Sequence, residues 1–243
     1  VIISPGNHDP FIKDSPYDLF SFEPNVHIFK SDEIEVLEEN DINIYGSAFM
    51  DFYRTNNPLN NINIIDNGKP NFLVLHCDLN GAKNKNDLSY LPISESTFKT
   101  LKFDYCALGH IHKKYISNDN RIVYPGSLIS FGFDELGEHG MIVGEVVNNT
   151  IHIDFIKIDN REFVEESIDV ELFNSQMEII DYINNYKFNK INFYKINLIG
   201  RRNFELNIKD IKSGITHDNI LQIKDLTKMN YDIESILNEK NLR

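Results

Sequence analysis

The sequence is poor in cysteine and has no long apolar run. Its 243 residues include only Cys77 and Cys106, too few for the disulfide framework that supports small secreted domains. Both cysteines lie in or beside apolar, strand-like segments, so we expect buried free thiols and a reducing, cytoplasmic setting. No stretch approaches the roughly 18 apolar residues of a membrane-spanning helix. The pattern therefore predicts a chain without a membrane segment.

Basic residues are also scarce. Lysine and arginine number 24 against 37 aspartates and glutamates, which gives a formal net charge of −13. Proteins that hold nucleic acid through its phosphates usually show a basic surface, because released counterions supply much of the affinity. This composition argues against unassisted binding to duplex DNA. With 41% hydrophobic residues, the chain can still bury the core of one large or two modest domains.

What is present is a set of short polar clusters, each placed where an apolar segment ends. They are GNHD at residues 6–9, His76, and GHIH at residues 109–112, and they follow residues 1–3, 72–75 and 104–108. In an open α/β sheet the carboxyl ends of the strands converge on one crevice. Imidazole and amide oxygen suit divalent ions such as manganese, iron or zinc. One such histidine is more often a loop or core residue, but the repeated setting predicts a metal site.

The hydrophobic pattern predicts two parts of different character. Strands are expected at residues 1–3, 42–45, 72–75, 104–108 and 122–124, then a hairpin of residues 141–147 and 150–158 that turns at Asn148-Asn149. From about residue 160 strands and helices alternate, over residues 162–168, 173–186, 193–199, 205–211, 220–226 and 232–239. We interpret this second part as a small α+β domain.

The motifs resemble a known family. GNHD, a histidine after a strand, and GHIH resemble the third, fourth and fifth motifs of the calcineurin-like metallophosphoesterases. ALGHIHK at residues 107–113 and RIVYPGS at residues 121–127 are similar to the SbcD-type DNA repair exonucleases of that superfamily. The resemblance implies an α/β fold, with part of a metallophosphoesterase-type β-sandwich flanked by helices in residues 1–160. A truncated α+β cap for DNA recognition would occupy residues 161–243.

Two motifs of the family are missing. Its enzymes begin with DxH and GD motifs, which supply ligands to the first ion and an aspartate that bridges both ions, and neither motif occurs here. We therefore interpret the chain, which opens on Val1 inside an expected strand, as an internal fragment. As given, it is expected to bind metal weakly and to cleave nothing. The full-length protein is expected to be a two-metal phosphoesterase.

The resemblance implies a ligand set. Asn7, His76 and His110 match the three ligands of the second metal ion, and His112 matches a ligand of the first. Two divalent metal ions are thus implied. Manganese is the family's usual activator, and iron, zinc and nickel remain alternatives because availability as well as affinity decides which ion is bound.

The resemblance also implies a catalytic pair. His8 matches the family's catalytic histidine, which stabilises the phosphate charge or protonates the leaving oxygen as a general acid. Asp9 would orient His8 from the next position, in the way that a carboxylate fixes an imidazole tautomer. The alternative for Asp9 is a turn or helix-cap aspartate before Pro10.

Candidates for substrate contact lie near the motifs and in the second part. They are Ser127 in the PGS corner, Lys113 and Lys114 after the GHIH motif, Lys83 and Lys85 in a polar loop, and Arg201 and Arg202 at the end of an expected strand. Each has a simple alternative as a turn residue or a solvated surface charge.

The leading functional hypothesis is a manganese-dependent DNA exonuclease or endonuclease subunit of a DNA repair complex. Its expected partners are DNA and an SbcC-type coiled-coil ATPase, with a homodimer as a further expectation and a cytoplasmic location. A second hypothesis is a phosphatase or phosphodiesterase for small substrates, which would not need the segment after residue 160. A third is a catalytically degenerate phosphoesterase fold that serves as a binding module.

Overall fold

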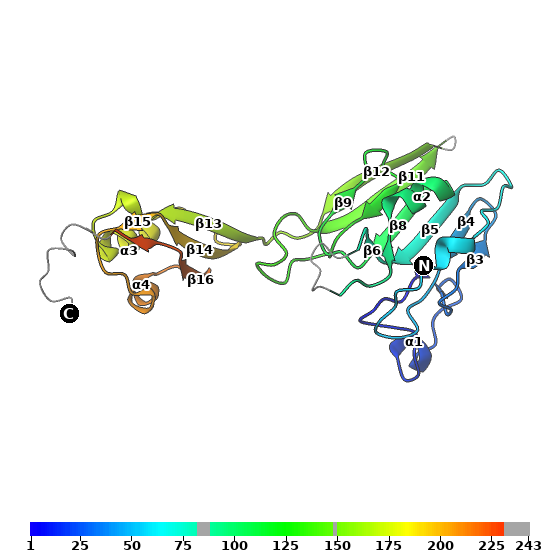
Figure 1. Cartoon of the computed structure of the whole chain (residues 1–243), viewed down its shortest axis with the longest axis horizontal. Helices are drawn as coiled ribbons and strands as arrows, with labels where there is room; N and C mark the ends of the chain where they lie inside the picture. Colours follow the sequence, from blue (N-terminus) through cyan, green and yellow to red (C-terminus); the bar gives the residue numbers. More distant parts are fainter. Residues whose placement is uncertain (82–87, 148–149, 231–243) are drawn as a thin grey trace, which may run out of the picture. The chain divides into compact units, whose positions relative to one another are not determined.

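The computed structural model describes residues 1–81, 88–147 and 150–230 (Figure 1). These residues form two compact units. The first contains residues 1–129 and 138–159, and the second contains residues 130–137 together with the chain from Asn160 onward. The roles expected for the two parts, a phosphoesterase core and a DNA-recognition cap, stay predictions. None of the helices in the described ranges has the length and apolar character needed to cross a membrane.

A mixed six-stranded sheet forms the centre of the first unit. Its strands, in spatial order, are β3 (Glu35–Glu38), β4 (Asn43–Gly46), β5 (Asn71–His76), β8 (Tyr105–Gly109), β10 (Ile122–Tyr124) and β9 (Tyr115–Ile116). The four inner strands are parallel, whereas β3 and β9 run antiparallel to their neighbours. The mixed α/β class predicted from the sequence is confirmed at this coarse level.

The core of the first unit lies on one face of this sheet. Alternate residues of β5 are buried, so Leu73 and Leu75 face the core while their neighbours face the other side. Phe98 of helix α2 (Glu95–Leu101) packs into the same cluster, and the side chain of Ser94 caps that helix by accepting from the Thr97 N–H. The 3₁₀ helix η1 (Pro58–Asn61) follows β4. The sequence prediction of buried free thiols at Cys77 and Cys106 is confirmed.

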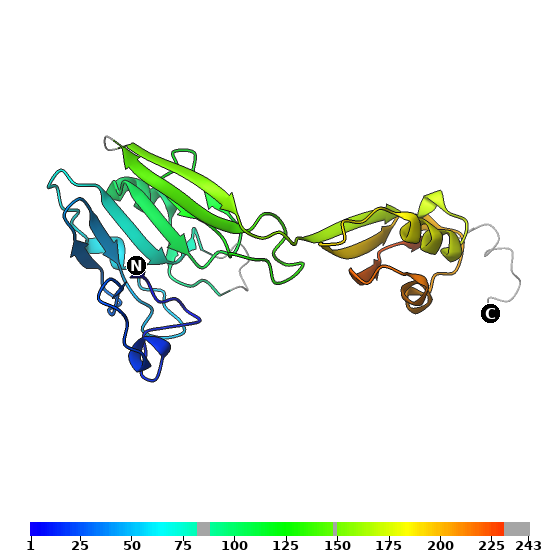
Figure 2. The same cartoon turned by 180° about the vertical axis from the view of Figure 1, so that it is seen from behind.

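A long hairpin covers the opposite face of the sheet (Figure 2). Strands β11 (Gly140–Val147) and β12 (Thr150–Lys157) pair antiparallel along their whole length. The predicted hairpin is therefore confirmed, and its expected turn at Asn148-Asn149 lies outside the described residues. Shorter elements complete the unit: β1 (Ile2–Ile3) pairs with β2 (His27–Ile28), β6 (Asp78–Leu79) pairs with β7 (Pro92–Ile93), and α1 (Pro16–Leu19) is a single turn.

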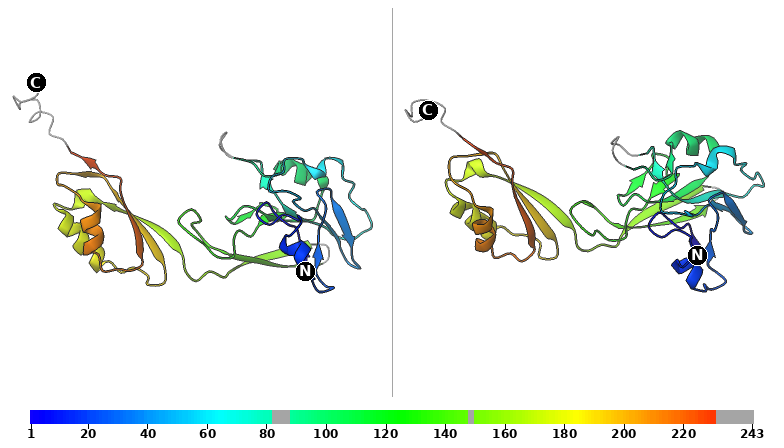
Figure 3. Two further views of the ribbon diagram at one scale, coloured as in Figure 1. Left: turned by 90° about the horizontal axis from the view of Figure 1, so that it is seen from below. Right: turned by 60° about the horizontal axis from the view of Figure 1, so that its bottom comes forward.

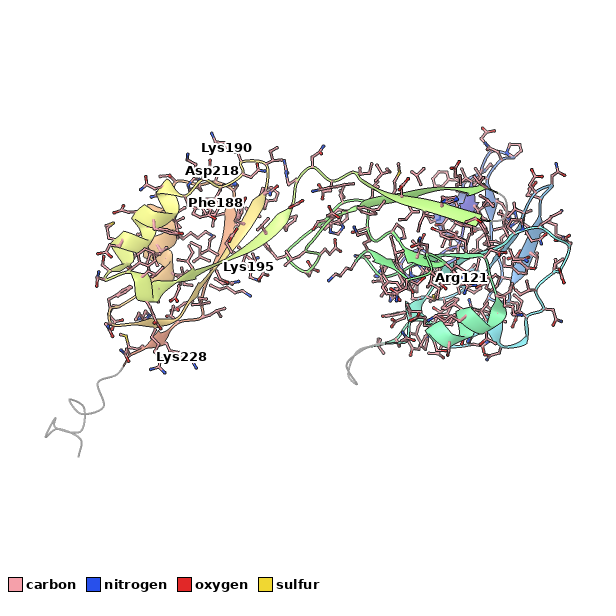
Figure 4. The ribbon with its side chains drawn as sticks, turned by 90° about the horizontal axis from the view of Figure 1, so that it is seen from above. Arg121, Phe188, Lys190, Lys195, Asp218 and Lys228 are labelled. Carbon is pink, nitrogen blue, oxygen red and sulfur yellow. The ribbon has the colours of Figure 1, made fainter. Side chains whose placement is uncertain are left out.

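The second unit is a three-stranded parallel sheet with helices on one face (Figure 3). Its elements are β13 (Phe163–Asp169), η2 (Val170–Leu172), α3 (Gln176–Asn185), β14 (Phe193–Ile199), β15 (Arg201–Arg202), α4 (Ile208–Gly214), β16 (Ile220–Asp225) and β17 (Lys228–Met229). Ile183, Ile196 and Ile211 are fully buried between helices and sheet. Lys195 alternates to the opposite face, where its ammonium lies 2.5 Å from the Glu165 carboxylate (Figure 4). The predicted helix at residues 232–239 lies outside the described residues.

Candidate metal centre

The ends of two neighbouring parallel strands bring His76 and His110 together. His76 is the last residue of β5 and stands in register with Gly109, the last residue of β8. His110 follows directly, and its ring centroid lies 5.1 Å from that of His76 at an interplanar angle of 65°. Figure 1 shows the two strands side by side. The convergence predicted from the strand ends is thus present for these two histidines.

Asn7 joins this pair from a different part of the chain. Its side chain is buried, and its Oδ1 lies 2.7 Å from Nε2 of His76. This is a hydrogen-bond distance when Nε2 carries the proton. Two neighbouring ligands that each sit about 2.1 Å from one ion are about 3 Å apart. The separation of these two atoms therefore suits a shared cation as well as a hydrogen bond.

The loop that carries Asn7 can approach His76 because residue 6 is glycine. A Cβ at Gly6 would lie 2.5 Å from the His76 ring, which is closer than real Cβ contacts come. The Asp9 carboxylate fixes the loop from the other side, since it accepts from the Gly6 N–H at 3.0 Å and from the Tyr17 hydroxyl. These contacts agree with a turn-forming role for Asp9, and its expected action on His8 stays a prediction.

His8 and His112 are exposed but lie within electrostatic reach of His76 and His110, which we call the inner pair. Burial, with the nearby His110, His8 and His112 acting in the same direction and Asp9 opposing them, lowers the pKa of His76 to about 4. Burial also lowers the pKa of His110, again with His112 and His8 acting in the same direction. The inner imidazoles are therefore neutral at pH 7, which is the form that coordinates metal ions.

The backbone around the GHIH motif is held in an unusual shape. His110 has a φ of 100°, in a region that non-glycine residues rarely adopt and that costs on the order of 1–3 kcal/mol. The carbonyl of His112 accepts from the Ser127 N–H at 2.9 Å, and the Ser127 hydroxyl lies 2.8 Å from Nδ1 of the buried His139. Gly126 makes this corner with a φ of 82°, and a Cβ there would press within 2.6 Å of the His112 carbonyl.

The basic residues that we expected to contact substrate lie in both units. In the first unit, Lys113 is exposed, whereas Lys114 bonds to Glu138 at 2.8 Å and its ammonium lies 4.0 Å from the centre of the Phe155 ring. In the second unit, Arg201 is exposed. Arg202 is largely buried and donates to the Thr227 hydroxyl and the Phe204 carbonyl. Lys83 and Lys85 lie outside the described residues. Arg202 is thus engaged in holding its own unit together.

Two side chains of this cluster, Asn7 and His76, have ligand atoms suited to a divalent cation. Asn7 and His76 have coordinating atoms at a suitable separation. Across the parts of the chain that the structure describes, however, no three His, Cys, Asp or Glu side chains are arranged to hold an ion. The cluster therefore supplies the neutral nitrogen and amide oxygen ligands expected of such a centre, but not a complete coordination shell.

Three side chains that shape this cluster were not predicted from the sequence. Tyr17 bonds to Asp9, Tyr90 packs against His110 at a centroid distance of 5.4 Å, and His139 bonds to Ser127. Their contacts depend on how distant loops fold back. A weak sequence signal existed for His139 alone, which precedes a glycine at the start of the predicted hairpin.

Comparisons with known proteins show similarity over part of the chain. No family model matches the sequence. The chain is 28% identical over 130 residues to the SbcD subunit of the nuclease SbcCD from Staphylococcus epidermidis. The match covers 46% of this chain and 34% of the relative, so the chain spans about a third of the length of that curated relative. The chain is therefore distantly similar, over part of its length, to a nuclease subunit.

Proposed function

We propose that this chain carries part of a metal-dependent phosphodiesterase that acts on nucleic acid. The observation that supports the proposal best is the meeting of Asn7, His76 and His110 at the ends of strands that are far apart in sequence. Packing alone gives little reason to gather histidines around a buried amide, because each buried polar group needs a partner. The partial similarity to a nuclease subunit supports phosphodiester hydrolysis as the reaction at this cluster.

In this proposal Asn7, His76 and His110 hold one divalent cation and His112 contributes to a second, with manganese as the first choice. Bound ions would neutralise charge on the phosphate and lower the pKa of a water nucleophile. The chain's own contribution is to keep the inner imidazoles neutral by burial. His8, exposed beside them, would donate a proton to the leaving oxygen. The corner at Ser127 would hold the backbone of His112 in place.

The wider assignments follow from the same proposal. The relative is named as one subunit of a nuclease, and we propose that this chain likewise works on DNA in the cytoplasm, with a coiled-coil ATPase as its partner. The net charge of −13 implies that a cation or a partner supplies the positive surface for the phosphate backbone.

A second candidate is a non-catalytic binding module with the same fold. The observation that favours it is the lack, within the described ranges, of three His, Cys, Asp or Glu side chains arranged around one point. A catalytic centre needs more ligands than the Asn7–His76 pair offers. The same experiment separates the two candidates, because a module without a metal centre should show no binding of manganese that depends on these side chains.

Manganese binding is the first test, because it requires only residues of this chain. Electron paramagnetic resonance of free Mn²⁺, titrated with protein, should show binding that His76→Gln and Asn7→Ala weaken at least about tenfold, as changes near metal ligands commonly do. His8→Ala and the exposed His152→Gln should bind as the parent does. Equal binding by the parent and His76→Gln would refute the proposed centre.

Cleavage assays then separate the nuclease from a small-substrate phosphodiesterase. The full-length protein should cut end-labelled single-stranded and duplex DNA in the presence of manganese and spare both when EDTA is added, whereas residues 1–243 alone should cut neither. Preference for a chromogenic diester over DNA would instead favour the small-substrate enzyme. Loss of turnover with retained manganese in His8→Ala would support the general-acid role, whereas loss of manganese would mean that His8 is a ligand.

A further inference from the structure

Aromatic side chains extend outward from the histidine pair. The Tyr90 ring contacts both His110, at a centroid distance of 5.4 Å, and Tyr53, at 5.6 Å. Tyr53 is 49% exposed, its neighbour Phe52 is 58% exposed, and Tyr90 is partly exposed. The candidate metal centre is thus continuous with a solvent-facing aromatic surface, made by Tyr53 and Tyr90, that we call the tyrosine platform.

The platform is fixed to the fold at both tyrosines. The Leu91 N–H donates to the Arg54 carbonyl at 2.6 Å, which ties the residue after Tyr90 to the residue after Tyr53. The buried Arg54 guanidinium donates to the Ser47 hydroxyl at 3.1 Å and to the Ala48 carbonyl at 3.0 Å. The segment that carries Tyr53 is therefore braced at both ends. Preorganisation of this kind lowers the cost of ordering side chains when a ligand binds.

The residue that follows Tyr90 has a strained backbone conformation. Leu91 has a φ of 51°, which is unfavourable for a branched side chain, and that side chain is fully buried. Strained residues persist where the surrounding structure forces them, and they cluster at ligand sites. Phe49, on the segment that leads to Tyr53, also packs edge-on against His76 at 5.4 Å. The platform and the histidine pair are therefore parts of one packed arrangement.

The chemistry of the platform favours a flat, uncharged group. Arg54 is the one basic residue in residues 47–54, and its guanidinium is used in the bonds that brace this segment. Asp51 is exposed in the same segment, so a phosphate would meet little attraction here. Tyrosine rings bind nucleobases by stacking, which contributes roughly 5- to 150-fold in affinity per base and tolerates any base.

We propose that Tyr53 and Tyr90 form a stacking subsite for an unpaired nucleobase, next to the centre that would hold the phosphate of the same strand. This inference rests on the proposed function, since it takes the histidine cluster as the phosphate site. It specifies the substrate as a strand with an accessible, unstacked base. A strand end, a gap or single-stranded DNA meets this condition, whereas a fully paired internal segment does not.

The test compares two fluorescein-labelled single-stranded oligonucleotides of equal length, one with normal bases and one with abasic positions. Both carry the same phosphates, so the difference in affinity measures the contribution of the bases. Fluorescence anisotropy with the whole chain, in EDTA, should show at least about fivefold tighter binding of the normal strand. Tyr53→Ala and Tyr90→Ala should remove this preference, and Tyr53→Phe and Tyr90→Phe should keep it.

Tyr182→Ala is the matched control, because Tyr182 is 43% exposed and lies in the second unit. It should leave the base preference unchanged. Equal binding of both strands by the parent, or binding of neither, would overturn the inference, as would Tyr53→Ala binding with the parent's preference. If Tyr90→Ala fails to fold, judged by circular dichroism, the exposed Tyr53→Ala decides. Base preference without any cleavage by the full-length protein would count against the proposed function alone, and cleavage by the full-length protein without base preference would count against the subsite alone.

Discussion

Acid should destabilise the first unit through His76. Burial, with help from His110, lowers the pKa of this side chain from its ordinary 6.5 to about 4. Between these pH values the unfolded chain binds a proton on His76 that the folded chain does not. Stability rises with pH wherever the unfolded state binds more protons. The free energy of unfolding should therefore fall as the pH drops from about 6.5 to about 4, and His76 should contribute no further loss below that.

The expected loss is large enough to measure. At about 1.4 kcal/mol per pKa unit, the shift of His76 corresponds to a loss of about 3 kcal/mol between pH 6.5 and pH 4. Urea unfolding in EDTA, followed by far-ultraviolet circular dichroism between about pH 7 and about pH 4.5, gives this quantity for each protein. His76→Gln has no titrating group at this position, so its stability should fall less steeply than that of the parent.

Two observations would refute this reasoning. One is a parallel loss of stability in the parent and in His76→Gln across the same pH range. The other is a titration of the His76 imidazole near its ordinary pKa, measured directly by nuclear magnetic resonance on the folded protein. His152→Gln is the matched control, because His152 is exposed on β12, and it should lose stability in step with the parent.

Three further changes test the packing around the centre. Gly6→Ala places a Cβ 2.5 Å from the His76 ring and should lower the free energy of unfolding by about 1–3 kcal/mol, measured by urea denaturation. Tyr17→Phe removes the hydroxyl that donates to Asp9. It should lower the free energy of unfolding by about 1 kcal/mol, seen as a lower thermal midpoint. Leu73→Ala empties a fully buried position in β5 and should cost about 2–5 kcal/mol in the same urea experiment.

Each of these changes has a matched control. Gly109→Ala brings a Cβ only to 3.3 Å from His76, so it should cost less than Gly6→Ala, and equal losses would contradict the steric argument. Tyr182→Phe removes a hydroxyl from a partly exposed tyrosine and should leave the thermal midpoint unchanged. Leu172 is 76% exposed, so Leu172→Ala should cost under about 0.5 kcal/mol. A similar cost for Leu73→Ala would mean that this face of the sheet is not the core.

Strands with a strong local signal could be predicted from the sequence. The run at residues 72–75 became β5, because a buried parallel strand reads as a continuous apolar segment. The run at residues 193–199 coincides with β14, where Lys195 and Asn197 alternate with apolar residues at the period of a strand. The closeness of His76 and His110 follows from the same signal, since parallel neighbours end at one edge. The alternation of strand and helix after residue 160 is likewise present in the described part of the second unit.

The elements that were missed lack such a signal. β3, at Glu35–Glu38, has only two apolar residues, side by side between two glutamates, at the edge of the sheet, and its strand character depends on pairing with β4. Helix α2, at Glu95–Leu101, is too short to show a helical period, although Ser94 is a recognisable cap. The contact between Tyr90 and His110 arises from the path of a loop, which no local pattern encodes. Tertiary contacts therefore determine most of what surrounds the histidine pair.

The in-register pairing of His76 with Gly109 links the centre to the folding of the sheet. Side chains alternate across a strand, so a slip of one residue between β5 and β8 would turn His76 to the face of the sheet that Leu73 and Leu75 occupy. Folding intermediates with the wrong strand alignment would therefore lack the cluster entirely. A spectroscopic signal from the two imidazoles would report correct strand alignment as well as the chemistry of the centre.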